Sequence, residues 1–189
     1  SIMLDSHQHV HMIPLIFHEL MKIIEEDDLD VGYLRMPAEP ILPFVLTPSL
    51  YTSYKPINIL KSIVLNTCNL FVNRKFRKEG IPSALFCGIM FSGHMDAERV
   101  MKVFPYFYRI AVRKQTDLEF LFHPGYILPE ECFMDSRKYC FNEFYLSEGR
   151  KVEYQTLHKE EFCNLVHRKN EQYYNRKEEY KRTSMISVK

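Results

Sequence analysis

The stretch Leu4-Asp5-Ser6-His7-Gln8-His9-Val10-His11 decides how the rest of the sequence is interpreted. It follows residues 2–4, an apolar run typical of a short strand. The acidic residue and the three histidines occupy alternate positions, so they would point to one side of the chain while it stays extended. Imidazole is the commonest metal ligand in proteins, and we predict that this stretch supplies a ligand and its supporting groups. The alternative is a set of hydrogen-bonded histidines in a turn.

Short apolar segments alternate with amphipathic ones along the rest of the chain. We predict strands at 2–4, 31–34, 84–90 and 118–122. A helix should begin near Pro14, because proline suits the first turn of a helix. Its apolar face is predicted to contain Phe17, Leu20, Met21 and Ile24.

The proline-rich segment 37–56 is predicted to be a long loop, because proline removes backbone donors and fixes φ. A helix should follow, and its buried side is predicted to contain Leu60, Ile63, Val64, Cys68, Phe71 and Val72. Another helix should be capped by Asp96, with Val100, Val103 and Phe104 facing inward. From Pro129 onward we expect mostly helix.

Strands that alternate with helices predict an α/β fold with a parallel sheet, whose sites lie at the carboxyl ends of the strands. The predicted strands are followed by the polar stretch 5–11, by Arg35, by His94 and by His123. We therefore expect these polar residues to contribute to one shared site.

Individual residues at these strand ends have more than one interpretation. His123 precedes Pro124-Gly125, which ends the strand, so it is placed either to act as a general acid or merely to cap a turn. Arg35 either orients a carboxylate or forms a solvated surface pair. For His94 we favour a position near a helix N-terminus over substrate binding.

Composition excludes several classes of protein. The 189 residues are enough for one domain, 46% are hydrophobic, and the formal net charge of +1 favours neither nucleic acid nor an anionic membrane as a partner. The five cysteines form no C-x-x-C pair, which favours a reducing, cytoplasmic setting. We find no motif of the P-loop, dinucleotide-binding, serine-hydrolase or H-E-x-x-H zinc-protease classes.

The quoted stretch resembles the signature of the YdjC/ChbG-like carbohydrate deacetylases. Arg35-Met36-Pro37-Ala38-Glu39 looks like the R-x-P-x-E segment of that family, and His123-Pro124-Gly125 looks like its H-P-G segment. Arg150-Lys151-Val152-Glu153, with Leu157, is similar to its closing R-x-x-E-x-x-x-L stretch. The motifs occur in the family's order, from Leu4 to about Leu157.

The resemblance implies a TIM-barrel-like α/β fold and one divalent metal ion, magnesium or zinc, held by an aspartate and two histidines. His7 matches a metal-binding histidine, and His123 matches the histidine that would act as the catalytic acid. The side chains that would bind substrate or support the pocket are Asp5, His9, His11, Arg35, Glu39 and His94. The family's Asp-Asp and G-x-H segments are not in this sequence, so we expect an incomplete barrel with an upstream portion missing.

The implied function is metal-dependent removal of the acetyl group from N-acetylated sugars such as chitooligosaccharides. We expect a deacetylase domain at 1–165, a polar, basic tail at 166–189, and self-association. Two alternatives stay open: an inactive carbohydrate-binding remnant of the same fold, and a metal-dependent hydrolase of another amide.

Overall fold

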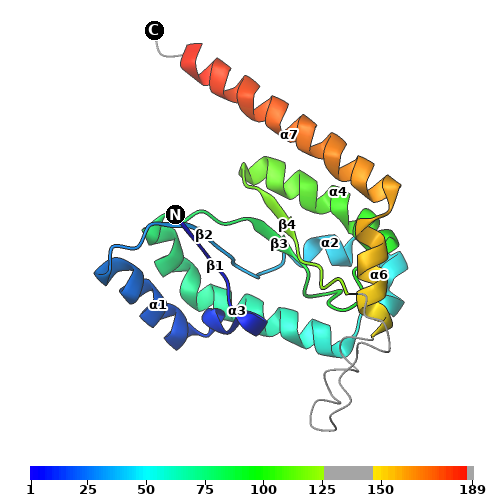
Figure 1. Ribbon diagram of the computed structural model, residues 1–189, viewed down its shortest axis with the longest axis horizontal. Helices are drawn as coiled ribbons and strands as arrows, with labels where there is room; N and C mark the ends of the chain where they lie inside the picture. Colours follow the sequence, from blue (N-terminus) through cyan, green and yellow to red (C-terminus); the bar gives the residue numbers. More distant parts are fainter. Residues whose placement is uncertain (126–146, 187–189) are drawn as a thin grey trace.

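The computed structural model describes residues 1–125 and 147–186, with side chains through residue 175, and has a mixed α/β fold (Figure 1). The strands are β1 (Ile2–Leu4), β2 (Val31–Leu34), β3 (Leu85–Cys87) and β4 (Leu118–Phe120). The α-helices are α1 (Pro14–Glu26), α2 (Leu42–Val45), α3 (Pro56–Glu79), α4 (Ala97–Lys114), α6 (Glu148–Leu157) and α7 (Glu160–Ile186). Two 3₁₀ helices are η1 (His7–Met12) and η2 (Pro48–Ser53).

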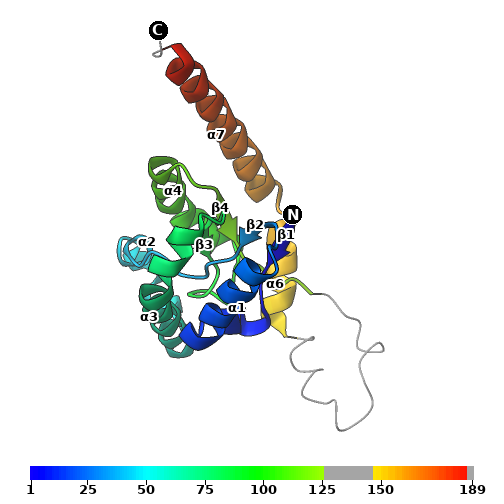
Figure 2. The same ribbon diagram turned by 90° about the vertical axis from the view of Figure 1, so that its left-hand side faces the viewer.

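The strands pair in parallel, as the alternation of strands and helices predicts. β1 pairs with β2, with Leu4 opposite Leu34, and β3 pairs with β4, with Phe86 opposite Glu119. One backbone bond joins the two pairs, from the N–H of Leu34 to the carbonyl of Pro82 at 3.0 Å. Helices α4, α3 and α1 lie along one side of the strands (Figure 2). That the strands form part of a TIM-like barrel stays a prediction.

Helix α4 confirms both its predicted cap and its predicted face. The Asp96 carboxylate accepts a hydrogen bond from the N–H of Arg99 at 2.8 Å, which satisfies a free donor of the first turn. Val100, Val103 and Phe107 are fully buried in the core cluster that also contains β3. This helix therefore fixes the position of β3 and β4, because its apolar stripe has no other place to be buried.

A second core lies around the first helix. Pro14 is in the first turn of α1, as predicted, and Phe17 and Met21 have no exposed area. They belong to a cluster with Leu34 of β2 and Val72 of α3. This cluster holds the β1–β2 pair against its two helices.

The segment 37–56 is more ordered than predicted. It contains α2 and η2, and each of these begins with a proline in its first turn, at Pro43 and Pro48. Proline is compatible with that position, since the N–H it lacks would have no helical partner there. Phe44 and Leu50 from this segment are buried in the α4 core.

The predicted buried side of α3 is wrong at four of its six positions, whereas Val72 is buried as predicted and Cys68 packs partly against the same core. Leu60, Ile63, Val64 and Phe71 are each more than half exposed, whereas Asn58, Ser62 and Val72 are buried. The polar side can face inward because Asn58 has partners there: its amide donates to the carbonyls of Met90 at 3.3 Å and Ser92 at 3.1 Å.

Residues 5–11 do not stay extended, which was the condition for their pointing to one side. Residues 7–12 form η1, and Gln8 and His9 have left-handed backbone angles, with φ of 53° and 59°. The alternate residues therefore do not point to one side. The reason is local, since Ser6 bonds the backbone and ring of His11 and turns the chain back on itself.

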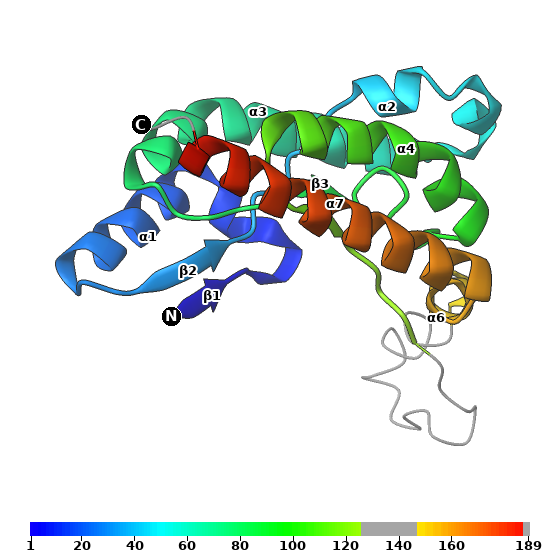
Figure 3. The same cartoon turned by 90° about the horizontal axis from the view of Figure 1, so that it is seen from above.

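The C-terminal part is helical where the structure describes it. Helices α6 and α7 confirm the prediction from residue 147 onward, while 129–146 lie outside the described residues. The far end of α7 projects beyond the other elements (Figures 1 and 2), and seen from above α7 runs across them (Figure 3). In the described part of the chain no helix is long and apolar enough to span a bilayer.

The register of α3 can be tested by two adjacent substitutions. Val72→Ala should lower the free energy of unfolding by about 2 kcal/mol, because it removes two fully buried carbons and leaves a small cavity. Phe71→Ala should change it by less than about 0.5 kcal/mol, because this ring is 67% exposed. Urea unfolding of both variants would measure the difference, and the opposite ranking would contradict the observed register.

Candidate functional site at the carboxyl ends of the strands

His11 links the ends of β1 and β2. It is 4% exposed, and its Nε2 lies 2.8 Å from the backbone carbonyl of Arg35. A carbonyl only accepts, so Nε2 carries the proton. Burial lowers the pKa of His11, which keeps the ring neutral, and its Nδ1 accepts from the Ser6 hydroxyl at 2.6 Å. Both ring nitrogens are thus occupied, which makes His11 a supporting residue of this edge.

Arg35 lies between two carboxylates from different strands. Its guanidinium forms ion pairs with Asp5, directly after β1, and with Glu119 of β4, to which Nε also donates at 2.7 Å. Burial lowers the pKa of Arg35, but the hydrogen bond and charge of Glu119 and the charge of Asp5 raise it overall. The Tyr33 hydroxyl donates to the other oxygen of Glu119. This network joins β1, β2 and β4 on one side.

His9 faces the same space from η1. Its side chain is 12% exposed, its Nδ1 lies 3.7 Å from Asp5 Oδ1, and its ring contacts Phe86 edge to face. Burial lowers the pKa of His9, and the charges of His11, Arg35 and His123 lower it further against the opposing effect of Asp5. The ring is therefore neutral at neutral pH. Left-handed angles at a non-glycine residue cost about 1–2 kcal/mol and concentrate at functional sites.

His123 follows β4 and is paired with a carboxylate that the sequence did not single out as a site residue. Glu153 of α6 has no exposed area and accepts the backbone N–H of His123. The His123 Nδ1 lies 3.9 Å from the same carboxylate oxygen. The imidazole side chain is 37% exposed, so the ring is anchored on one side and open on the other.

Two further predicted residues, His94 and Glu39, lie in or against the chain that follows β3. The N–H of Met95, next to His94, donates to Glu153 at 3.2 Å. Burial lowers the pKa of His94, and the nearby Lys55 and Arg99 lower it further. Glu39 is 2% exposed, and its carboxylate accepts the N–H groups of the three residues that follow β3, 88–90.

The structure thus brings Asp5, His9 and Arg35 together after β1 and β2, and His123 is near enough for its charge to act on His9. Sequence reasoning missed Tyr33, Glu119 and Glu153 as parts of this arrangement. Glu119 had a signal, since it is the one charged residue in the predicted strand 118–122. Glu153 was quoted in a motif without a role.

Comparison with known protein families identifies the family of this chain. A family model for YdjC-like proteins matches residues 3–168. The chain belongs to the YdjC-like family. Membership relates it broadly to carbohydrate deacetylases and a hydrolase kind of activity. No curated protein and no solved structure matches the chain.

The metal ion expected for a YdjC-like protein finds no complete ligand set in residues 1–125 and 147–175, whose side chains are described. Within these ranges no three His, Cys, Asp or Glu side chains are grouped so that they could hold an ion. His7 is exposed in η1, while His11 is already bound through both ring nitrogens. These residues therefore do not fit a metal centre by themselves.

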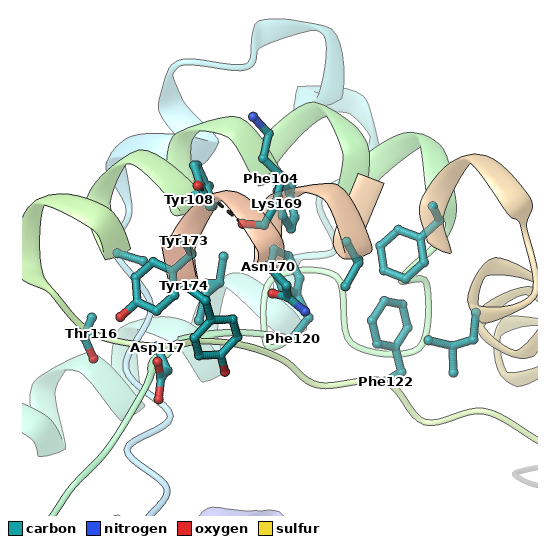
Figure 4. Close-up of a pocket in the computed structure, with 15 residues that line it drawn as sticks. Phe104, Tyr108, Thr116, Asp117, Phe120, Phe122, Lys169, Asn170, Tyr173 and Tyr174 are labelled. Atoms are coloured by element: carbon teal, nitrogen blue, oxygen red, sulfur yellow. Dashed lines mark hydrogen bonds between the residues drawn. The ribbon is translucent and has the colours of Figure 1, made fainter. Parts of the chain in front are cut away.

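A cavity of about 480 Å³ lies on the other face of β4 (Figure 4). Leu118, Phe120 and Phe122 line it, and they alternate along the chain with Glu119 and His123. Its remaining walls are formed mainly by residues of α4 and α7, among them aromatic rings visible in Figure 4, together with Thr116, Asp117 and Leu157. None of the site residues predicted from the sequence lines this cavity, so the candidate site and the cavity are separated by the strand.

The titration of Glu39 predicts a pH dependence of stability. Burial raises its pKa from 4.5 to about 7, although its three N–H bonds act in the opposite direction. Between these values the folded state binds more protons than the unfolded state, so the contribution of Glu39 to the free energy of unfolding decreases as pH rises. Urea unfolding across this range should show a slope that Glu39→Gln removes. An unchanged slope in that variant would contradict the shifted pKa.

Proposed function

We propose that this YdjC-like protein is a hydrolase that removes the acetyl group from N-acetylated sugars. Family membership supports the reaction class, and the observation that carries the proposal is the placement of His123. Its backbone N–H is held by the buried Glu153, its charge acts on His9, and its side chain is 37% exposed. A histidine held in this way is suited to move a proton to or from a bound substrate.

In the proposed reaction water adds to the acetamide carbonyl carbon, the carbon–nitrogen bond breaks, and acetate and a free amino sugar are released. The role of His123 is to donate a proton to the departing nitrogen, since an amide nitrogen leaves readily only as an amine. The neutral ring of His9 and the network around Arg35 line the space on the other side. Because Arg35 forms ion pairs with both Asp5 and Glu119, it reduces the repulsion between these two carboxylates.

One divalent metal ion, magnesium or zinc, belongs to the proposal, with His7 as one ligand. When bound, such an ion would polarise the acetamide carbonyl and lower the pKa of a water molecule bound to it. The described residues do not place two further ligands beside His7. Sugar specificity for chitooligosaccharides rests on the resemblance alone and is likewise proposed.

The lack of a complete metal-ligand set among the described residues favours a second candidate. This is a carbohydrate-binding protein of the same family that does not hydrolyse the bound sugar. Calorimetric titration with Mg²⁺ and Zn²⁺ separates the two. Stoichiometric binding with loss on His7→Ala supports the enzyme, whereas binding of an N-acetylated sugar without metal binding or acetate release supports the second candidate.

The proposed role of His123 predicts a large kinetic effect. His123→Ala should reduce acetate release from an N-acetylated chitooligosaccharide by about 100-fold or more, since positioned general acids contribute about 10²–10⁴-fold. His167→Ala is the matched control, because His167 is 78% exposed on α7 and should leave the rate unchanged. Acetate would be measured in the presence of Mg²⁺ or Zn²⁺. Retention of more than about half the rate by His123→Ala would contradict the assignment.

A further inference from the structure

Helix α6 begins in direct contact with the two loops that carry His94 and His123. Gly149 lies so close to the backbone carbonyl of Gly93 that a Cβ atom would overlap it. The Arg150 guanidinium donates to the carbonyl of Pro124 at 3.0 Å, and the N–H of Gly125 donates to the Arg150 carbonyl at 3.2 Å. The first turn of α6 is thus fixed to the loop after β3 and to the loop after β4.

Glu153 extends this contact into the interior. One carboxylate oxygen accepts the N–H of Met95 at 3.2 Å, and the other accepts the N–H of His123. The side chain has no exposed area, so these donors replace the water that an ionised carboxylate would otherwise need. A single carboxylate therefore joins both histidine loops to one helix.

The orientation of the His123 ring follows from the same carboxylate. Its Nδ1 is buried, has no hydrogen-bond partner among the described residues, and lies 3.9 Å from Glu153 Oε2. This distance is too long for a hydrogen bond, and catalytic hydrogen bonds are often this loose before substrate binds and tighten in the complex. The exposed area of the ring belongs to its other atoms, because Nδ1 itself is buried.

We propose that Glu153 is a positioning residue for His123: its buried carboxylate holds the histidine loop and directs the ring so that Nδ1 carries its proton toward Glu153 and Nε2 faces the substrate. This inference rests on the proposed function for the role of His123, but the orientation of the ring does not. A base held by a third, orienting group is a recurrent arrangement in catalytic sites.

The first test needs no activity, and its decisive measurement is made on the unsubstituted protein. In long-range ¹⁵N–¹H spectra of the full chain, the neutral His123 ring should be the tautomer protonated at Nδ1. Glu153→Gln should lower the share of that tautomer, because the amide is a weaker acceptor than the carboxylate. Glu148→Gln is the matched control, since Glu148 is exposed on the same helix and should leave the spectrum unchanged. A neutral ring protonated at Nε2 in the unsubstituted protein would overturn the proposal.

The second test is kinetic and separates positioning from a purely structural role. Glu153→Gln should lower kcat by about 10- to 100-fold with KM changed by less than about twofold, because orientation of the acid matters after substrate has bound. In a His123→Ala background the same substitution should have no further effect on the rate. Full additivity of the two losses would overturn the proposal. Absence of acetate release from the unsubstituted protein would instead contradict the proposed function and leave the spectroscopic test decisive for Glu153.

Discussion

The Glu39 carboxylate is the interaction on which the site edge depends. Strand β3 ends at Cys87, and the next three N–H groups, of Gly88, Ile89 and Met90, all donate to this one side chain. Without it, three donors would be buried with no partner, at a cost of about 1–3 kcal/mol each. The backbone after β3 therefore follows the path that lets these three N–H groups reach the Glu39 carboxylate. Since Glu39 comes from the segment after β2, the same bonds also tie two strand ends together.

Glu153 repeats this principle one strand further on. It receives the N–H groups of Met95 and His123, so the loops after β3 and β4 are held by a buried acid instead of by sheet hydrogen bonds. Near these two buried carboxylates, Arg35 forms ion pairs with Asp5 and Glu119. In the motif of residues 4–11, Ser6 bonds His11, and His11 bonds the backbone carbonyl of Arg35, which joins the ends of β1 and β2. Many residues of the sequence motifs thus form contacts that hold loops in place, and these loops carry the histidines.

The sequence predicted the order of strands and helices, the parallel pairing and the residues at the strand ends, because hydrophobic period and strand-end chemistry are local signals. It did not predict the inward face of α3, since Asn58 is buried only because the carbonyls of Met90 and Ser92 are there to receive it. The shared orientation of residues 5–11 required an extended chain, whereas Ser6 bonds His11 and forms a turn. Long-range partners such as these cannot be read from spacing along the chain.

The roles of Glu39 and Glu153 show the same limit. Each belongs to a recognisable motif, but nothing in the motif says that the carboxylate receives backbone donors from another loop. The most direct test of this account is amide hydrogen exchange by NMR in Glu39→Ala, which removes both acceptor oxygens. The account predicts that the amides of residues 88–90 are protected in the unsubstituted protein and exchange at least about tenfold faster in the variant, while those of α4 are unchanged. Equal protection of residues 88–90 in both proteins would contradict the central role of the buried carboxylate.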